Sequence, residues 1–302
     1  MKMSVIRQRL KPWMLPIAML MGLLFHDAID AVAFLAPYLI FVMLFITFCR
    51  VNLREFRVTG LSWSLLAVQI VGAALVYLAI RPFSESVAQG AFICVFCPTA
   101  TAAPVIAGML GGSVPRLATF SLISNMAVAL LAPPVFALIG PGDVVFFDSF
   151  RSIAGRVVPL ILAPLAVALS LRKVAPKVHR AVGEHQSIAF YVWALSLIIV
   201  VGRAVSFVLS EPSDAIPVML VLASVSGVVC VAQFVAGRKI GRRCGDRIVG
   251  AQGLGQKNTV LAIWMALTYL DPIASVAPAA YVAWQNMINS FQIYLKQRRP
   301  DF

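Results

Sequence analysis

The chain has 302 residues, of which 61% are hydrophobic and 12% are charged, and its mean hydropathy is +0.91. Water-soluble globular proteins carry about 25% charged residues, so this composition excludes a soluble domain. It also excludes a disordered chain, which would be far less apolar. The composition predicts an integral membrane protein in which residues 1–302 form a single transmembrane unit.

Apolar runs separated by polar residues predict ten membrane-spanning helices, because a backbone in lipid must satisfy its own hydrogen bonds. In chain order the runs lie near residues 13–26, 31–49, 62–80, 87–112, 115–139, 153–171, 187–209, 216–237, 248–270 and 272–295. No cleavage pattern of small residues follows the first run, so we interpret it as an uncleaved span rather than a signal peptide.

The net charge of +13 reflects where the basic residues lie between these runs. With both termini in the cytoplasm, 20 of the 25 Lys and Arg residues fall on the cytoplasmic side, as the positive-inside rule requires. The remaining five are Arg81, Arg151, Arg156, Arg203 and Lys257. The charge therefore predicts a multi-pass protein of the cell (inner) membrane that contacts membrane lipid, and nucleic acid is not needed to explain it.

Two of the ten spans contain helix breakers followed by polar residues at mid-membrane depth. The fourth span reads FCPTATAAPVIAGMLGG (96–112), and the ninth contains GAQGLGQKNTVLAI (250–263). Half-helices that begin after Pro98 and Gly255 would present free N–H groups and positive dipole ends, which favour an anion. Interrupted helices at matching places are a strong pointer to a transporter binding site. The side chains that could orient a carboxylate there are Thr99, Thr101, Asn258 and Thr259.

Ten spans divide into two sets of five, and an odd number of spans per set means that the two sets run in opposite directions through the membrane. We therefore expect an all-α fold of two inverted five-helix repeats, 13–140 and 152–296, in which the broken fourth and ninth spans cross.

The segments CPTATAAPVIAGMLGG, GLGQKNTVLA and VAWQNMINS (282–290) resemble motifs of the bile acid sodium symporter family in order and spacing. The resemblance implies a panel domain (13–49 and 153–209) and a core domain (62–139 and 216–295) that move against each other. It also implies a substrate site at the crossing. Thr101, Asn258 and Asn286 match family positions near the substrate, Gln285 stands where the family often has His, and Gln69 lies in a similar glutamine-containing third span.

The sodium ligands of that family are not retained. At the corresponding positions this chain has Ala103, Pro104, Leu117, Ser121, Gly253 and Lys257. Only Ser121 keeps an oxygen side chain, whereas sodium needs several oxygen ligands and an ammonium would repel it. We hypothesise that Lys257 replaces the sodium charge or carries a proton. The residues assigned to ion or proton coupling are Lys257, Ser121, Gln69 and Gln256.

The predicted function is therefore a secondary active transporter or facilitator of a small organic anion, such as a steroid acid or a hydroxy or keto acid. An enzyme is not expected, because no span carries the acidic residues or histidines of an intramembrane protease. An anion channel remains an alternative, since polar residues at broken helices also line pores. A transport-derived sensor is a further alternative. No cofactor and no obligatory protein partner are expected.

Overall fold

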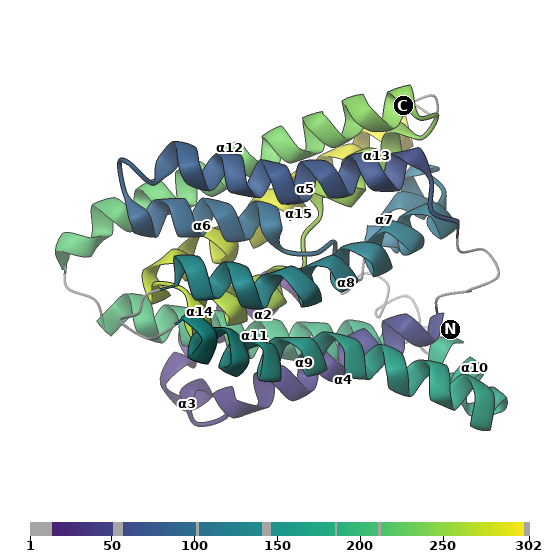
Figure 1. Ribbon diagram of the computed structural model, residues 1–302, viewed down its shortest axis with the longest axis horizontal. Helices are drawn as coiled ribbons and strands as arrows, with labels where there is room; N and C mark the ends of the chain where they lie inside the picture. The colour runs from purple at the N-terminus through teal and green to yellow at the C-terminus, as the bar shows by residue number, and fades with distance from the viewer. Residues whose placement is uncertain are drawn as a thin grey trace.

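The computed structural model describes residues 14–50, 57–100, 103–140, 146–184, 186–210 and 213–298, which are almost entirely helical (Figure 1). Within these ranges no β-strand is found, so the prediction of an all-helical fold is confirmed for them. Three helical stretches are long and apolar enough to cross a membrane, and they indicate a membrane protein: Gly60–Ile80, Val114–Ile139 and Ser213–Arg243. The count of ten spans and their inverted repeat stay predictions.

Six helices pack against one another in the lower part of Figure 1, and we call them the first group. They are α2 (Met14–Leu24), α3 (His26–Asp30), α4 (Ala36–Arg50), α9 (Phe146–Val174), α10 (Pro176–Glu184) and α11 (Gln186–Ser210). Small residues allow close packing here, since a Cβ at Gly202 of α11 would lie 2.8 Å from the Ile29 side chain of α3. A short 3-10 turn, η2 (Ala33–Leu35), leads into α4.

The remaining helices pack together in the upper and middle parts of Figure 1 and form the second group. They are α5 (Gly60–Ile80), α6 (Glu85–Phe96), α7 (Ala103–Leu110), α8 (Val114–Ile139), α12 (Ile216–Arg243), α13 (Arg247–Gly255), α14 (Thr259–Tyr269) and α15 (Val276–Arg298). Two 3-10 turns, η3 (Ser213–Ala215) and η4 (Pro272–Ser275), precede α12 and α15. Leu220, Val228 and Val235 are exposed along α12, as expected of a face that meets lipid.

Short polar side chains set the starts of the helices that matter for the site. Ser84 accepts a hydrogen bond from the Val87 N–H at the start of α6 (3.4 Å), and Asp246 accepts one from the Val249 N–H at the start of α13 (2.9 Å). Such N-caps satisfy backbone donors that have no partner within the helix. α6 and α13 are short helices that begin at these caps and enter the molecule from opposite ends (Figure 1).

Candidate functional site

The two interrupted helices of the second group meet at their breaks. The backbone leaves helical geometry between α6 and α7 and between α13 and α14, and an antiparallel β-bridge pairs Thr99 with Lys257. The Ala100 N–H donates to the Gln256 carbonyl (2.9 Å), and the Asn258 N–H donates to the Pro98 carbonyl (2.8 Å). The two chains therefore satisfy each other's backbone groups where neither forms a helix, as a break inside the membrane requires.

Gln69, in the middle of α5, holds the carboxyl end of α6. Its side-chain amide donates to the carbonyls of Phe96 (2.7 Å) and Cys97 (3.3 Å), and its oxygen accepts a hydrogen bond from the Ser124 hydroxyl of α8 (2.7 Å). Gln69 is fully buried. The last carbonyls of a helix have no partner within it, so Gln69 supplies donors that the break of α6 makes necessary.

Lys257 lies at the centre of the crossing and is 1% exposed. Its Nζ donates to the Val95 carbonyl in the last turn of α6 (2.7 Å), and its backbone N–H donates to Gln285 Oε1 of α15 (2.9 Å). The carboxyl end of a helix carries a partial negative charge. The Lys257 side-chain nitrogen is thus buried against a helix terminus that attracts positive charge.

Two residues that the sequence analysis did not assign to the site complete the capping of the breaks. Gln233 of α12 donates to the Cys94 carbonyl (3.1 Å) and to the Tyr281 hydroxyl (3.0 Å). The Tyr281 hydroxyl in turn donates to the carbonyl of Gly255, the last residue of α13 (2.8 Å). The sequence could have indicated Tyr281 as a site residue, because a tyrosine inside an apolar run needs a hydrogen-bond partner for its hydroxyl when it is buried.

Thr99 and Asn258 each stabilise one of the two non-helical segments at the crossing. The Thr99 hydroxyl donates to the Gly253 carbonyl near the end of α13 (2.7 Å), and the Ser124 hydroxyl accepts the Thr99 N–H (3.3 Å). Asn258 caps α14, because its Oδ1 accepts the Leu261 N–H (3.3 Å). Both side chains therefore stabilise the non-helical backbone at the crossing.

The other predicted site residues lie at or near the crossing. The Ser121 hydroxyl donates to the Thr99 carbonyl (3.5 Å), and Thr259 is buried at the first position of α14. Asn286 is half-buried and donates to the Val282 carbonyl of its own helix (2.6 Å). Gln256 is buried, and its Oε1 has no hydrogen-bond partner among the described residues, nor has Asn258 Nδ2. The prediction for Thr101 lies outside the described residues.

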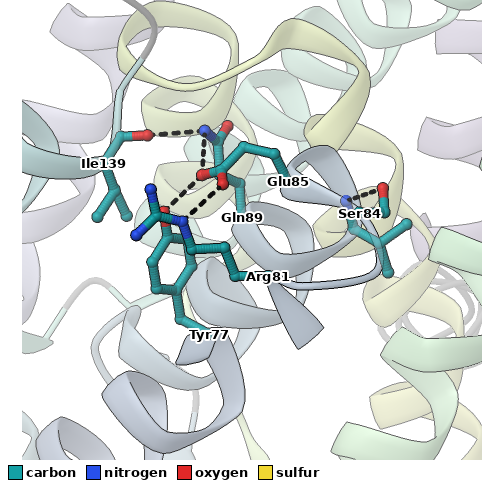
Figure 2. A network of polar contacts seen from close by, with 7 residues as sticks. Tyr77, Arg81, Ser84, Glu85, Gln89 and Ile139 are labelled. Atoms are coloured by element: carbon teal, nitrogen blue, oxygen red, sulfur yellow. Dashed lines mark hydrogen bonds and ion pairs between the residues drawn. The ribbon is translucent and has the colours of Figure 1, made fainter. Parts of the chain in front are cut away.

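A polar network joins the ends of several helices where α5 turns into α6 (Figure 2). Glu85 accepts hydrogen bonds from the Tyr77 hydroxyl, from Arg81 Nε (3.2 Å) and from Gln89 Nε2 (3.3 Å). The Gln89 amide also donates to the Ile139 carbonyl at the end of α8 (2.7 Å). These contacts tie α5, α6 and α8 together on one side of the crossing.

A cavity lies between the two groups of helices, away from the residues predicted to bind substrate. It has a volume of about 710 Å³ and is lined by η2, α4, α9, α11 and α14, with Arg203 and Trp264 among its residues. Residues predicted to contact substrate at the crossing are not among its lining residues. In this conformation the crossing is packed, and open space lies beside the later turns of α14.

Groups of three or more His, Cys, Asp or Glu side chains that could hold a metal ion do not occur among the described residues. Comparison of the chain with models of protein families and with curated proteins found no match. The functional argument therefore rests on the geometry of the crossing and of the cavity.

Proposed function

We propose that the chain is a secondary active transporter or facilitator of a small organic anion that works by alternating access without sodium coupling. Residues 1–302 would act as one transport unit in the inner membrane, with both termini on its cytoplasmic side. The proposal includes membership of the bile acid sodium symporter family, in which the second group of helices would be the core and the first group the panel.

The buried side chain of Lys257 at the crossing is the observation that carries this proposal. A lysine at the centre of a membrane helix costs about 2.5–3.5 kcal/mol on insertion scales, and here it contacts the Val95 carbonyl at a helix terminus (2.7 Å). Intramembrane charges of this kind usually mark ion or substrate pathways. A fixed cation would supply the positive charge that a coupling ion supplies in a symporter.

Contacts at three levels support an inverted repeat in the second group. The Ser86 hydroxyl donates to Asp271 Oδ2 at one end, Thr99 pairs with Lys257 at the centre, and the Ser113 N–H donates to Asp246 Oδ2 at the other end (3.0 Å). At one end the start of α6, in the first half of the chain, meets Asp271, which precedes η4 and α15 in the second half. At the other end the start of α13, in the second half, meets Ser113, which precedes α8 in the first half. The same pattern with reversed direction is what two inverted repeats would produce.

The proposal is tested by uptake of radiolabelled cholate, lactate and pyruvate into liposomes that contain the purified protein, under imposed sodium and pH gradients. We expect saturable uptake of at least one of these acids without sodium. In Lys257→Gln, uptake should fall at least tenfold, because the fixed charge is lost. Lys239→Gln is the matched control, since Lys239 is exposed near the end of α12, and it should transport like the wild type.

The gradients separate the two roles of Lys257. Dependence on an imposed pH gradient that disappears in Lys257→Gln would assign it to proton transfer, and independence of both gradients would assign it to a fixed charge. Transport that requires sodium and is unchanged in Lys257→Gln would contradict the proposal. A conductance far above the turnover of a carrier would favour a channel instead.

A further inference from the structure

The cavity between the two groups of helices contains one formal charge. Of the described residues that line it, only Arg203 is charged, and it lies in the apolar helix α11 near the end at Ser210. The Arg203 side chain is exposed, and it has no hydrogen-bond or ion-pair partner in the described part of the chain. An arginine in an apolar helix could reach the lipid interface, but this one also lines the open cavity between the two groups.

Two further hydrogen-bond donors line the same cavity without a protein acceptor. The Tyr38 hydroxyl of α4 and the Trp264 indole N–H of α14 make no hydrogen bond to the described residues. The Thr268 hydroxyl, which also lines the cavity, donates to the Trp264 carbonyl (2.6 Å). The Thr268 hydroxyl oxygen can still accept a hydrogen bond. Three side chains that line the cavity, Arg203, Tyr38 and Trp264, thus have N–H or O–H donors without an acceptor among the described residues. Of these three, Arg203 is cationic.

The rest of the lining is apolar or aromatic, and the volume of about 710 Å³ is within the range of about 300–1,000 Å³ that small-molecule sites have. A guanidinium pairs well with a carboxylate, since two N–H groups can donate in parallel to its two oxygens. Apolar walls around one such anchor suit a ligand with a single carboxylate and an apolar body. Dicarboxylates would leave their second charge without a partner here.

We propose that Arg203 binds the carboxylate of an apolar monocarboxylate in this cavity, with Tyr38 and Trp264 as additional donors. The inference rests on the proposed transport function and names the substrate class and the residue that selects it. Arg203 and Tyr38 belong to the first group of helices and Trp264 belongs to the second. A bound ligand therefore contacts both groups, and its binding depends on how they are placed against each other.

The test is ligand binding by the full-length protein in nanodiscs of phosphatidylcholine, measured as a shift of the melting temperature, since a ligand of the native state raises it. The probes are benzoate, octanoate and cholate, each compared with its neutral amide. We expect at least one acid to raise the melting temperature while its amide does not. The apparent affinity for that acid should fall at least tenfold in Arg203→Gln and less in Arg203→Lys.

Two variants make the result specific to the cavity. Arg151→Gln removes an exposed arginine that does not line the cavity, and it should bind like the wild type. Trp264→Phe keeps a ring but removes the N–H, so it should weaken binding a few-fold without loss of fold. Wild-type affinity in Arg203→Gln, or equal binding of acids and amides, would overturn the inference.

The source of the anion is tested separately with nanodiscs that contain phosphatidylglycerol. If native mass spectrometry shows Arg203-dependent retention of phosphatidylglycerol while none of the acids binds, the cavity is a lipid site and the inference is wrong. If an acid is taken up by liposomes with an unchanged KM in Arg203→Gln, the inference fails and the transport function stands. If wild-type protein binds an acid through Arg203 but transports none, the transport function fails instead.

Discussion

At the scale of single residues, Gln69 shows how much of the crossing depends on one side chain. Its amide satisfies the carbonyls of Phe96 and Cys97. Gln69→Leu would leave both carbonyls buried without a partner, at about 1–3 kcal/mol for each group. We expect the free energy of unfolding to fall by about 2–5 kcal/mol, measured by denaturant titration in mixed micelles.

A matched control for Gln69→Leu is Ser64→Ala, on the same helix. The Ser64 hydroxyl donates to the Gly60 carbonyl in an exposed turn (2.9 Å), and such surface changes usually stay within about 0.5 kcal/mol. An equal loss of stability in the two variants would show that the capping of α6 by Gln69 does not stabilise the crossing.

The sequence placed several polar residues at the crossing, and the structure brings Gln69, Thr99, Lys257, Asn258 and Gln285 together there. Their contacts could not be predicted, because the sequence does not show which donor reaches which carbonyl at a helix end. The described polar contacts of these residues are mostly to backbone groups and to one another. Arg203 was assigned no role, since an arginine that lines a cavity and one that reaches lipid look the same in a sequence.

At the scale of elements, the pairing of α12 with α13 depends on glycines. A Cβ at Gly237 would lie 2.1 Å from the Gly250 carbonyl oxygen, and one at Gly241 would lie 2.3 Å from the Asp246 carbonyl oxygen. Gly237 and Gly241 are spaced as in the small-residue motifs that let membrane helices approach closely. The backbones of α12 and α13 are therefore in direct contact, and no flexible side chain can move to make room.

Gly237→Ala should push α13 away from α12 and disturb the end of α13 at the crossing. We expect a loss of stability of about 1–3 kcal/mol, as for overpacked cores, together with reduced uptake. Gly155→Ala in α9 is the control, because a Cβ there meets nothing within 4 Å and alanine favours a helix by about 1 kcal/mol. A Gly237→Ala protein as stable as Gly155→Ala would contradict the close contact.

Hydropathy predicts the long helices well, since each apolar run of the sequence coincides with described helices. It does not predict α10, a short helix with exposed Lys177 and Arg180 in a connection between two apolar runs. The apolar run at 115–139 does predict a helix that continues through Pro133 and Pro134, as α8 does, but it does not show which groups make this possible. Prolines are tolerated in membrane helices where neighbouring groups satisfy the freed carbonyls, and those neighbours come from the tertiary structure.

At the scale of the whole molecule, the cavity lies between two groups of helices that would move against each other if the chain transports as proposed. Tyr38 of α4 and Thr268 of α14 line it from opposite groups. A flexible bismaleimide between Tyr38→Cys and Thr268→Cys should fix the two groups and lower uptake at least tenfold. Cys244→Ser provides the background, because Cys244 is exposed and the other four cysteines are buried.

The same reagent between Ala223→Cys of α12 and Trp284→Cys of α15 joins two helices of one group, since the Trp284 indole N–H donates to the Ala223 carbonyl (3.0 Å). This link should leave uptake unchanged, because the second group is held together by the contacts at Ser86, at the crossing and at Asp246. If the link across the cavity also left uptake unchanged, transport would not require the two groups to move relative to each other. The core and panel assignment would then be wrong, whatever the role of Lys257.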